Sequence, residues 1–351
     1  MTRGTLQTAS RSAAGVHVRE ADLERELDAI IRVFDTSFNV ESSRERFRWL
    51  YCDNPDGRAT TWVVVEQATG EIVGGTAVFP RRMRVGGARG IAIAWNCGDF
   101  AILNRYRTMG AALKLRRAAK DAIDGGQVPF LYAHPNDRML AVHMRAGHFV
   151  LGRMVRHARP LRLTTQFAAV NTLSAHMLRL WRPTGARRGV DVEMVAAARL
   201  PDDFDAVDAE AATALRTGIV RDRRYIEWRF GRNPLYASDV LVVRERGRAT
   251  GFLVFTMQGQ VGLVKDWLAV TPTARDTLFA ALVRELGKRG AATASVIAME
   301  SHPDIPALRA LGFVLRPEQS SVVTYAAAAN PLRDTLLDPG RWYMTVGDRD
   351  I

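Results

Sequence analysis

The sequence contains few of the residues that build disulfide frameworks or metal sites. It has two cysteines, Cys52 and Cys97, and seven histidines among its 351 residues. Two cysteines cannot form a disulfide framework, and free thiols are typical of a reducing compartment. The histidines and cysteines do not show the spacing of a zinc or other transition-metal site. The sequence therefore predicts a cytoplasmic protein without a metal cofactor.

Long hydrophobic runs are also absent from the sequence. No apolar segment approaches the roughly 20 residues that a membrane-spanning helix needs. The sequence has neither a Gly-x-Ser-x-Gly nucleophile turn nor the phosphate-binding P-loop motif. Its hydrophobic content of 47% and charged content of 25% are those of an ordinary globular protein. We therefore expect no membrane span, and the length of 351 residues favours two domains.

Lysine is scarce, although the formal net charge is +12. There are only four lysines, so arginine carries nearly all of the positive charge. The densest arginine clusters are 81–84 and 153–162. Neither cluster alternates with the aromatic side chains on which single-stranded nucleic acid stacks. This pattern predicts a solvated surface with some phosphate contacts, and it disfavours nucleic acid as a partner.

One turn between an apolar strand and a helix is rich in small residues. The strand ends at Leu103, the turn carries Arg107-x-x-Gly110-x-Ala112, and the helix continues to Gly125-Gly126. Small residues let a ligand lie close to the backbone where the helix begins. The free N–H groups and the positive end of the helix dipole favour a phosphate there. The turn therefore predicts a pyrophosphate site.

The segments around this turn alternate between strands and helices. Hydrophobic spacing predicts strands at 16–19, 62–65, 72–79 and 128–132, and helices at 23–34 and before Gly147. With the signature turn, residues 16–157 resemble the GCN5-related N-acetyltransferases, whose signature is Arg/Gln-x-x-Gly-x-Gly/Ala after a strand. The resemblance implies an α/β (α+β) fold in which a mixed, mostly antiparallel sheet is flanked by helices.

The same resemblance implies the substrates and the residues that bind them. The acyl donor would be acetyl-CoA, and the acceptor would be the primary amine of a small molecule or glycan. The donor-binding groups would be backbone N–H groups late in the strand, the signature turn and an asparagine before the next helix. These residues are Ala101, Ile102, Arg107, Thr108, Met109, Gly110, Ala111, Ala112 and Asn136.

Three further residues receive roles from the resemblance. Asp99 occupies the place of the carboxylate that takes the proton of the amine, often through water. The alternative is that Asp99 caps a strand or pairs with an arginine. His143 stands where the family usually has the tyrosine that protonates the CoA thiolate. The alternative is that His143 packs in its helix and that Tyr132, Tyr106 or water donates the proton. Tyr51 is expected to touch substrate, because the second helix of this fold borders the acceptor groove.

A motif of the first half of the sequence recurs in the second half. The segments 49–55 and 228–234 share the pattern Trp-x-aromatic-x-x-Asn-Pro. Strands follow each segment, and later His134-Pro135 recurs as His302-Pro303. Because the matches keep their order, they predict two copies of one fold.

The second copy lacks the glycine of the signature turn. Its corresponding segment, 271–280, contains Leu278 and Phe279, which we expect to place bulk where a pyrophosphate would need bare backbone. We therefore expect acetyl-CoA to bind the first copy alone. The second copy would cover or complete the acceptor site.

These patterns divide the chain into five segments. We name 16–160 the first copy, 190–328 the second copy and 329–351 the tail. A disordered leader is expected at 1–15. A connector is expected at 161–189, with an amphipathic helix around Phe167–Trp181. In the tail, Trp342-Tyr-Met344 is expected to pack onto a domain.

The sequence leaves three classes of function to compare. The first is an N-acetyltransferase, and similar tandem proteins among bacterial cell-surface polysaccharide genes suggest an amino sugar or nucleotide-sugar acceptor. The second is a Fem-like transferase that uses aminoacyl-tRNA. Such enzymes lack a good CoA signature in both copies, so the intact turn at 107–112 argues against this class. The third is a non-catalytic protein that binds CoA or an amine, which His143 in place of tyrosine supports.

Overall fold

The structure is a computed structural model that describes residues 15–86, 90–162, 189–212 and 216–350. Most of the predicted leader and the predicted connector helix at 167–181 lie outside the described residues. The first copy runs as strand, helices, three strands, helix, strand, helix and strand, in the order that the sequence predicts. Its main elements are β1 (Val16–Glu20), α1 (Leu23–Phe38), α2 (Arg44–Phe47), a π-helical turn (Arg48–Cys52), β2 (Thr60–Glu66), β3 (Ile72–Arg84), β4 (Ile91–Ile102), a 3-10 helix (Asn104–Met109), α3 (Ala111–Asp124), β5 (Phe130–Ala133), α4 (Asp137–Arg145) and β6 (Phe149–Pro160).

The second copy repeats this order with one short additional strand, β8, between its first two helices, and this confirms the predicted tandem arrangement. Its main elements are β7 (Val190–Ala196), α6 (Asp205–Ala211), β8 (Gly218–Ile219), α7 (Arg223–Ile226), a π-helical turn (Glu227–Gly231), β9 (Asp239–Glu245), β10 (Arg248–Gln258), β11 (Val261–Ala269), α8 (Pro272–Lys288), β12 (Thr293–Met299), α9 (Ile305–Ala310) and β13 (Val314–Ala326). Each copy of the repeated tryptophan motif lies on a π-helical turn. The tail adds α10 (Arg333–Leu337) and two 3-10 turns (Pro339–Arg341 and Val346–Asp348).

The described strands form one continuous sheet through both copies. Its order is β1-β2-β3-β4-β5-β13-β6-β12-β11-β10-β9-β7, with β8 attached to β3. Neighbouring strands are antiparallel except for β4 with β5 and β11 with β12, which are parallel. The fold is therefore the mixed, mostly antiparallel sheet flanked by helices that the sequence predicts.

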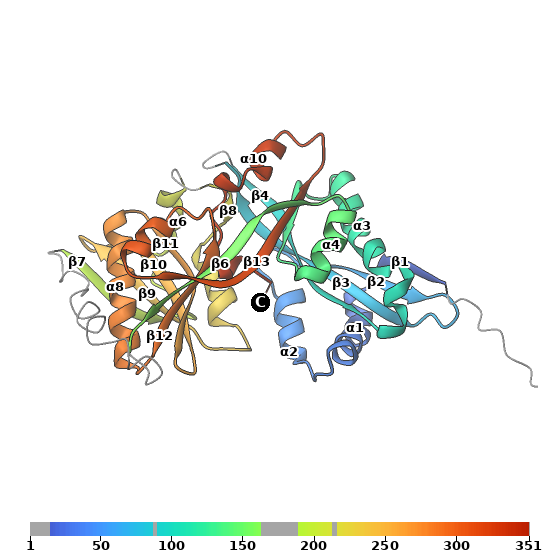
Figure 1. The fold of residues 1–351 in the computed structure, drawn as a ribbon, viewed down its shortest axis with the longest axis horizontal. Coiled ribbons are helices and arrows are strands. Elements are labelled where there is room, and N and C mark those ends of the chain that lie inside the picture. The colour runs from blue at the N-terminus through green and yellow to red at the C-terminus, as the bar shows by residue number, and fades with distance from the viewer. Residues whose placement is uncertain (1–14, 87–89, 163–188, 213–215, 351) are drawn as a thin grey trace, which may run out of the picture.

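The two copies exchange their last strands. In the first copy β5 pairs with β13 of the second copy, from Phe130 opposite Ala326 to Ala133 opposite Val323. In the second copy β12 pairs with β6 of the first copy over the whole of β12. The exchanged strands β6 and β13 also pair with each other and cross the middle of the molecule (Figure 1). The copies follow one another along the chain, but in space each contains a strand of the other.

Helices cover both faces of this sheet. In the first copy α3 packs on one face, where Leu115 and Ala119 join a core with Trp62 and Trp95. In the second copy α8 packs over a corresponding core of its own. The other face carries one large core to which both copies contribute, through α1 and the two π-helical turns among others. The junction between the copies is thus part of the hydrophobic interior.

The repeated tryptophans meet at the centre of this shared core. The indole nitrogen of Trp49 donates to the carbonyl oxygen of Trp228 at 3.0 Å, and that of Trp228 donates to the carbonyl of Trp49 at 3.2 Å. The two rings stack with centroids 5.1 Å apart. Guanidinium groups lie over them, Arg229 over Trp49 and Arg81 over Trp228. The tryptophans of the repeated motif therefore also form a reciprocal contact between the two copies.

The tail packs against both copies, whereas the sequence predicted only that its aromatic segment packs onto a domain. Trp342, Tyr343 and Met344 are buried. Isolated bridges join Trp342 to Thr217 and Thr345 to Ala298. The C-terminal end of the tail reaches the centre of the molecule, beside α2 (Figure 1). A segment that follows the second copy in the sequence thus returns to the first copy.

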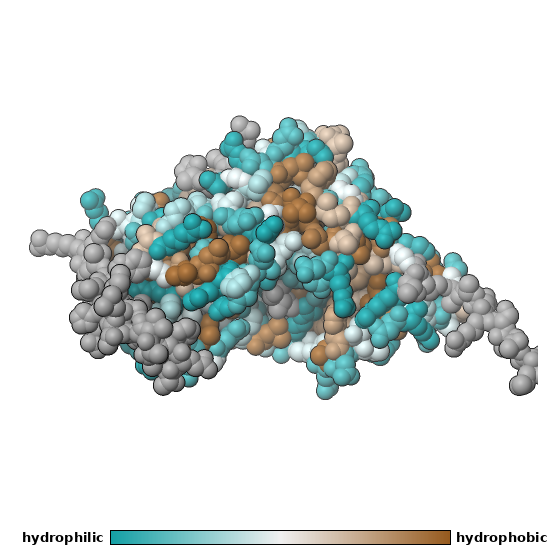
Figure 2. Space-filling view, viewed as in Figure 1, coloured by the Kyte–Doolittle hydropathy of each residue, from teal (hydrophilic) through white to brown (hydrophobic). Residues whose placement is uncertain are grey.

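The surface is mixed in polarity. Figure 2 shows hydrophilic residues spread over both flanks and a larger hydrophobic patch over the middle of the visible face. Within the described residues no helix combines the length and the hydropathy that crossing a membrane requires.

We expect the Trp49–Trp228 contact to make the stability of one copy depend on the other. Trp49→Phe removes the donor to a buried carbonyl and should lower the free energy of unfolding by about 1–3 kcal/mol. The double variant with Trp228→Phe should be non-additive in chemical denaturation, because the rings touch. Trp62→Phe, in the separate core under α3, should combine additively with Trp228→Phe. Additive losses for the 49/228 pair would contradict an energetic coupling between the copies.

Candidate active site

Asp99 lies at an irregularity of β4. Phe100 pairs with Thr76 and Gly98 with Ala77, so Asp99 is an extra residue without a partner in β3. Its φ of 35° lies in the left-handed region, which a residue other than glycine seldom adopts. A bulge of this kind turns a side chain out of the regular alternation of the strand. The structure therefore presents the predicted base from a strained backbone position.

Two side chains donate hydrogen bonds to the carboxylate of Asp99. Arg46 donates from both terminal nitrogens, at 2.5 and 2.7 Å, and the Tyr51 hydroxyl donates at 2.9 Å. Arg46 and Asp99 are both largely buried, so water screens this bidentate pair weakly. Burial and the neighbouring Asp99 carboxylate raise the pKa of the Tyr51 phenol well above its usual value, so Tyr51 remains a proton donor. The pairing of Asp99 with an arginine is the alternative that the sequence left open.

Tyr51 itself differs from its expected place. It is fully buried and does not line the cavity in front of Asp99. Its ring packs between Phe47 and Phe79. Tyr51 thus contacts the Asp99 carboxylate and not the cavity.

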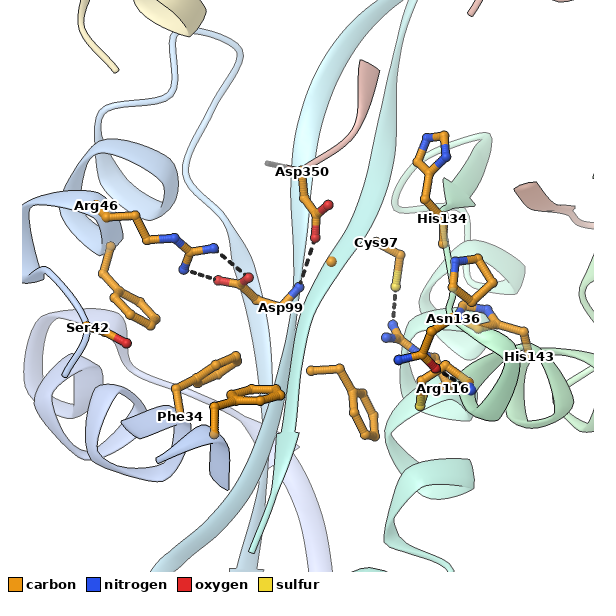
Figure 3. A pocket seen from close by; sticks show the side chains of 17 residues that line it. Phe34, Ser42, Arg46, Cys97, Asp99, Arg116, His134, Asn136, His143 and Asp350 are labelled. Carbon is orange, nitrogen blue, oxygen red and sulfur yellow. Dashed lines mark hydrogen bonds and ion pairs between the residues drawn. The ribbon is translucent and has the colours of Figure 1, made fainter. Parts of the chain in front are cut away.

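A cavity opens where β4 and β5 separate. Their parallel pairing ends at Cys97 with Ala133, so β4 continues past the end of β5. The cavity has a volume of about 380 Å³ and is lined by the bulge of β4, by the segment between β5 and α4 and by side chains of α1 and α2. Figure 3 shows Asp99 and Arg46 on one side of it and His143, Asn136 and Arg116 on the other. Asp99, His143 and Asn136, predicted from separate motifs, are therefore brought together.

His143 lines the cavity but is buried, with 1% of its surface exposed. Its Nδ1 lies 2.7 Å from Nδ1 of His148, so one of these atoms is the donor and the other the acceptor. Burial and the nearby Arg116 charge lower the pKa of His143 far below its usual value, and they lower that of His148 to about 3. A neutral imidazole is a poor acid, so this environment corresponds to the packing alternative rather than to the predicted proton donor.

The two tyrosines considered in place of His143 are also engaged. The Tyr132 hydroxyl donates to the Asp348 carbonyl at 3.1 Å, and the Tyr106 hydroxyl donates to Glu66 at 2.6 Å. Burial is the main factor that raises the pKa of both phenols. Asn136 likewise has a structural role, because its side chain accepts from the Met139 N–H and caps α4. Each of these side chains therefore has a partner within the fold.

The signature turn follows the end of β4, beyond the residues of β4 that pair with β5. Residues Asn104–Met109 form a 3-10 helix, Arg107 donates to the Ile102 carbonyl at 3.0 Å, and Gly110 has a φ of 70°. No side chain caps the first N–H groups of α3, which begins with the small Ala111 and Ala112. A Cβ atom on Gly110 would meet nothing within 4 Å. The side chains of Thr108 and Met109 lie outside the described residues.

The second copy carries different chemistry at the same two places. Its β11 also has an extra residue, between Val264 and Asp266, and this residue is Lys265. Burial and the charge of Arg229 lower the pKa of Lys265 to about 8, and its ammonium lies over the Tyr236 ring. At the repeat positions of Arg46 and Tyr51 the second copy has Tyr225 and Phe230. The bulge is therefore conserved between the copies, whereas the arginine–aspartate–tyrosine cluster is confined to the first.

The start of α8 does not offer free N–H groups as the start of α3 does, but the reason differs from the one that the sequence suggested. Leu278 and Phe279 lie in the second turn of α8 and point into the core of the second copy, so they do not crowd the helix start. That expectation was wrong. Instead β11 leads into α8 through Val270 and Thr271, without the 3-10 helix of the first copy. The Thr271 hydroxyl accepts from the Ala274 N–H and so caps the helix.

Sequence reasoning missed the contribution of the tail to this site. Asp350 lines the cavity, and its Oδ2 accepts from the Asp99 N–H at 3.3 Å. Figure 3 shows its carboxylate directly beside the bulge. Arg116 of α3 was missed as well, although it also lines the cavity and donates to the Cys97 thiol. Asp350 lies far from the signature in sequence and carries no motif, so only the return of the tail reveals it.

The geometry agrees with that of several solved structures. No protein-family model matches the chain, and no curated protein matches it. A probable N-acyltransferase from Enterococcus faecalis superposes with a TM-score of 0.68 at 13% identity, over 89% of this chain and 73% of its own. A GCN5-related N-acetyltransferase from Anabaena variabilis gives 0.66 at 13% identity, with the same two coverages. A tandem protein of this class from the clavulanic acid biosynthesis pathway gives 0.55 at 11% identity, over 89% of this chain and 98% of its own.

The chain has the fold of the GCN5-related N-acetyltransferases. Two copies of this fold stand in tandem, as the repeated motif predicted. Among the described residues no group of three or more histidine, cysteine or acidic side chains is placed to hold a metal ion.

The difference between the two turns predicts where the donor binds. Gly110→Trp should abolish acetyl-CoA binding in calorimetry, because the indole would occupy the open space over the uncapped start of α3. Gly126→Trp is the matched control: Gly126 also has a positive φ and open space around it, but it follows the other end of α3. Both variants should lose similar stability, and the control should keep its affinity. Two bound acetyl-CoA molecules per chain would contradict the assignment to the first copy.

Proposed function

We propose that the protein is an acetyl-CoA-dependent N-acetyltransferase whose first copy holds the active site. The observation that carries this proposal is the asymmetry between the copies. The first copy alone combines an uncapped small-residue turn with a carboxylate at the bulge of β4. The second copy has a capped helix and a lysine at the corresponding positions. The neighbours of the same fold that are described as acetyltransferases support the reaction class.

The donor would lie along the edge of β4 that β5 leaves uncovered. The turn at 107–112 would receive the pyrophosphate through the N–H groups at the start of α3. The backbone near Ala101 and Ile102 would follow the donor toward the cavity and supply N–H groups for the thioester carbonyl. Both residues are buried and lie just beyond the bulge, so their backbone is held rigidly. This arrangement would bring the acetyl group to Asp99.

The amine must lose a proton before it attacks the thioester carbon. We assign this proton to Asp99, through a water molecule, because Asp99 lines the cavity. Arg46 and Tyr51 donate three hydrogen bonds to it, which fix the direction of the carboxylate. A carboxylate has about four acceptor sites, so it retains capacity for a water molecule. After attack, the C–S bond breaks and the CoA thiolate takes up a proton.

We assign that last proton to water rather than to His143. The buried, neutral His143 and its partner His148 form a packed pair beside α3. The guanidinium of Arg116 lies close to this pair and lines the same cavity. A fixed positive charge there would stabilise a departing thiolate without giving up a proton.

The acceptor and the cellular context form the next part of the proposal. A small-molecule or glycan amine fits the reaction class, and an amino sugar or nucleotide-sugar of a cell-surface polysaccharide is suggested by analogy alone. A cytoplasmic location agrees with the two free cysteines. A Fem-like use of aminoacyl-tRNA is disfavoured by the uncapped turn of the first copy. Binding of acetyl-CoA without turnover over a broad amine panel would favour the third class, a sensor.

Asp99→Asn should separate chemistry from donor binding. We expect kcat to fall by about 10²- to 10⁴-fold while acetyl-CoA affinity is retained, as for the loss of a general base. CoA release from acetyl-CoA with a panel of primary amines measures kcat, and calorimetry measures the affinity. Tyr51→Phe keeps the carboxylate and removes one of its donors, so its effect should be smaller. Full activity in Asp99→Asn would reduce Asp99 to a structural partner of Arg46.

The pH–rate profile should be insensitive to His143. Because burial lowers the pKa of His143, its imidazole is neutral across the working range and does not titrate there. His143→Phe should therefore keep both limbs of the wild-type profile at the same pH. Loss of the high-pH limb would show instead that His143 is the acid. His157→Phe serves as a control, since burial also lowers the pKa of His157 and it lies on β6.

A further inference from the structure

A buried arginine lines the cavity in front of Asp99. Arg116 of α3 is only 3% exposed, and Figure 3 shows its guanidinium across the cavity from Arg46. Its Nη1 donates to the Cys97 thiol, and the guanidinium lies over the ring of Phe100. Its Nε has no hydrogen-bond partner among the described residues. Arg116 is therefore incompletely bonded within the described part of the chain.

The contacts of Arg116 with described residues include no carboxylate. A guanidinium stays protonated in proteins, and buried arginines are nearly always paired with an acid. Burial raises the pKa of the Cys97 thiol, which therefore stays neutral beside Arg116. His143 and His148 are neutral as well, because burial, and after it the charge of Arg116, lowers the pKa of both imidazoles. Such a charge is costly to bury unless a ligand supplies the opposite charge.

The acids that line the same cavity are engaged with other cations. Both carboxylate oxygens of Asp99 accept hydrogen bonds from Arg46. The Asp350 carboxylate accepts from the Asp99 N–H, and its charge acts on Arg46 and Arg349. The negative charges at the bulge of β4 are thus offset by arginines on their own side. Across the cavity, Arg116 has no such partner among the described residues.

The position of Arg116 indicates which anion could reach it. In the proposed function the CoA pyrophosphate lies at the turn before α3, whereas Arg116 contacts β4 at Cys97, two residues from Asp99. An anion beside Arg116 would therefore belong to the reacting end of a substrate. The acyl group of the donor and the amine acceptor meet there, and both can carry a carboxylate. A guanidinium matches a carboxylate well, because it can donate two parallel hydrogen bonds.

We propose that Arg116 binds a carboxylate of one of the two reactants, carried either by the acyl group of the donor or by the amine acceptor. The carboxylate would supply the acid partner of Arg116 and hold the reacting group in front of Asp99. A guanidinium has five N–H donors, so the same residue can face the sulfur of CoA while it holds the carboxylate. This inference rests on the proposed function, since it assigns a specificity-determining residue of the same cavity.

Stable thioethers of CoA test the donor as the source of the carboxylate. S-ethyl-CoA and S-carboxymethyl-CoA have tails of nearly the same size, and only the second tail carries a carboxylate. If the acyl group is the source, calorimetry on the full-length protein should show that S-carboxymethyl-CoA binds about tenfold or more tightly. A difference of this size is expected for a charge-assisted hydrogen bond.

Amino acids and the amines formed by their decarboxylation test the acceptor as the source. Suitable pairs are phenylalanine with phenethylamine and lysine with cadaverine, because the members of each pair differ only in the carboxylate. If the acceptor is the source, saturation-transfer NMR titrations of the CoA-bound protein should show tighter binding of the amino acid in at least one pair, again by about tenfold or more.

Substitutions then assign the preference to Arg116. Arg116→Gln should abolish the preference for the carboxylate and leave the binding of the matched probe without it nearly unchanged. Arg116→Lys keeps a charge but loses the planar fork, so it should retain a smaller preference. Arg117→Gln is the matched control, because Arg117 is the next residue of α3 and is exposed, and it should behave like the wild type. Thermal unfolding of each variant checks that the fold is kept.

The outcomes separate this inference from the proposed function. Equal binding within every pair of probes, or a preference that Arg116→Gln retains, would overturn the role of Arg116 even if acetyl transfer is observed. A preference for the carboxylate that Arg116→Gln removes would support the role of Arg116 and identify the reactant that carries the carboxylate. The same pattern without CoA release from any acyl donor and amine would support the carboxylate site and contradict the transferase.

Discussion

The reciprocal exchange of β6 and β13 is the constraint on which the rest of the structure depends. If each copy kept its own last strand, the molecule would be two sheets joined by a connector. Because β13 lies beside β5 and β6 beside β12, the backbone hydrogen bonds of each copy are completed by the other. Strand pairing is obligatory for buried backbone groups, so neither copy has a finished sheet alone. The shared core and the reciprocal tryptophan contact follow from this continuity.

This continuity also explains how a copy without the signature turn can serve the other. The second copy keeps the bulge of its β11 but fills it with Lys265, and it caps α8 with Thr271. Its buried Arg221 and Arg229 instead hold the tail. A buried arginine between two aspartates is costly to desolvate, and it is favourable only when its donors are satisfied. The second copy therefore retains its framework, while its polar interior is organised around the tail.

Asp99 has a strained backbone, and several neighbouring groups hold it in place. The left-handed backbone and the bulge cost energy, and the surrounding contacts must hold them in place. Arg46 and Tyr51 hold the side chain, and the Asp350 carboxylate receives the backbone N–H. The three supports come from α2, from the π-helical turn and from the tail. Segments far apart in the sequence thus hold this one strained residue in its conformation.

Local patterns in the sequence were sufficient for the fold of each copy. Hydrophobic spacing, the turn at 107–112 and the repeated tryptophan motif predicted the order of elements and the tandem arrangement, because these signals act over a few residues. The motifs also brought Asp99, Asn136 and His143 to one cavity. Tertiary structure decided the environment of each of them there. Burial makes His143 a packed neutral imidazole, Arg46 engages Asp99, and Tyr51 lies behind it.

The strand exchange and the place of Asp350 were not predictable from the sequence. A last strand can pair with its own copy or with the other at nearly equal local cost, so its partner depends on contacts between distant segments. Asp350 lies at the site because a buried arginine network holds the tail. The positions expected for Leu278 and Phe279 were wrong for a related reason. The second copy lacks a 3-10 helix between β11 and α8, so α8 begins earlier than the repeat suggested, and the sequence alone does not show where this helix begins. The sequence by itself determined the elements and their order, because these depend on neighbouring residues. The tertiary structure decided the environment of each functional group, because burial and charge come from residues far away in the chain.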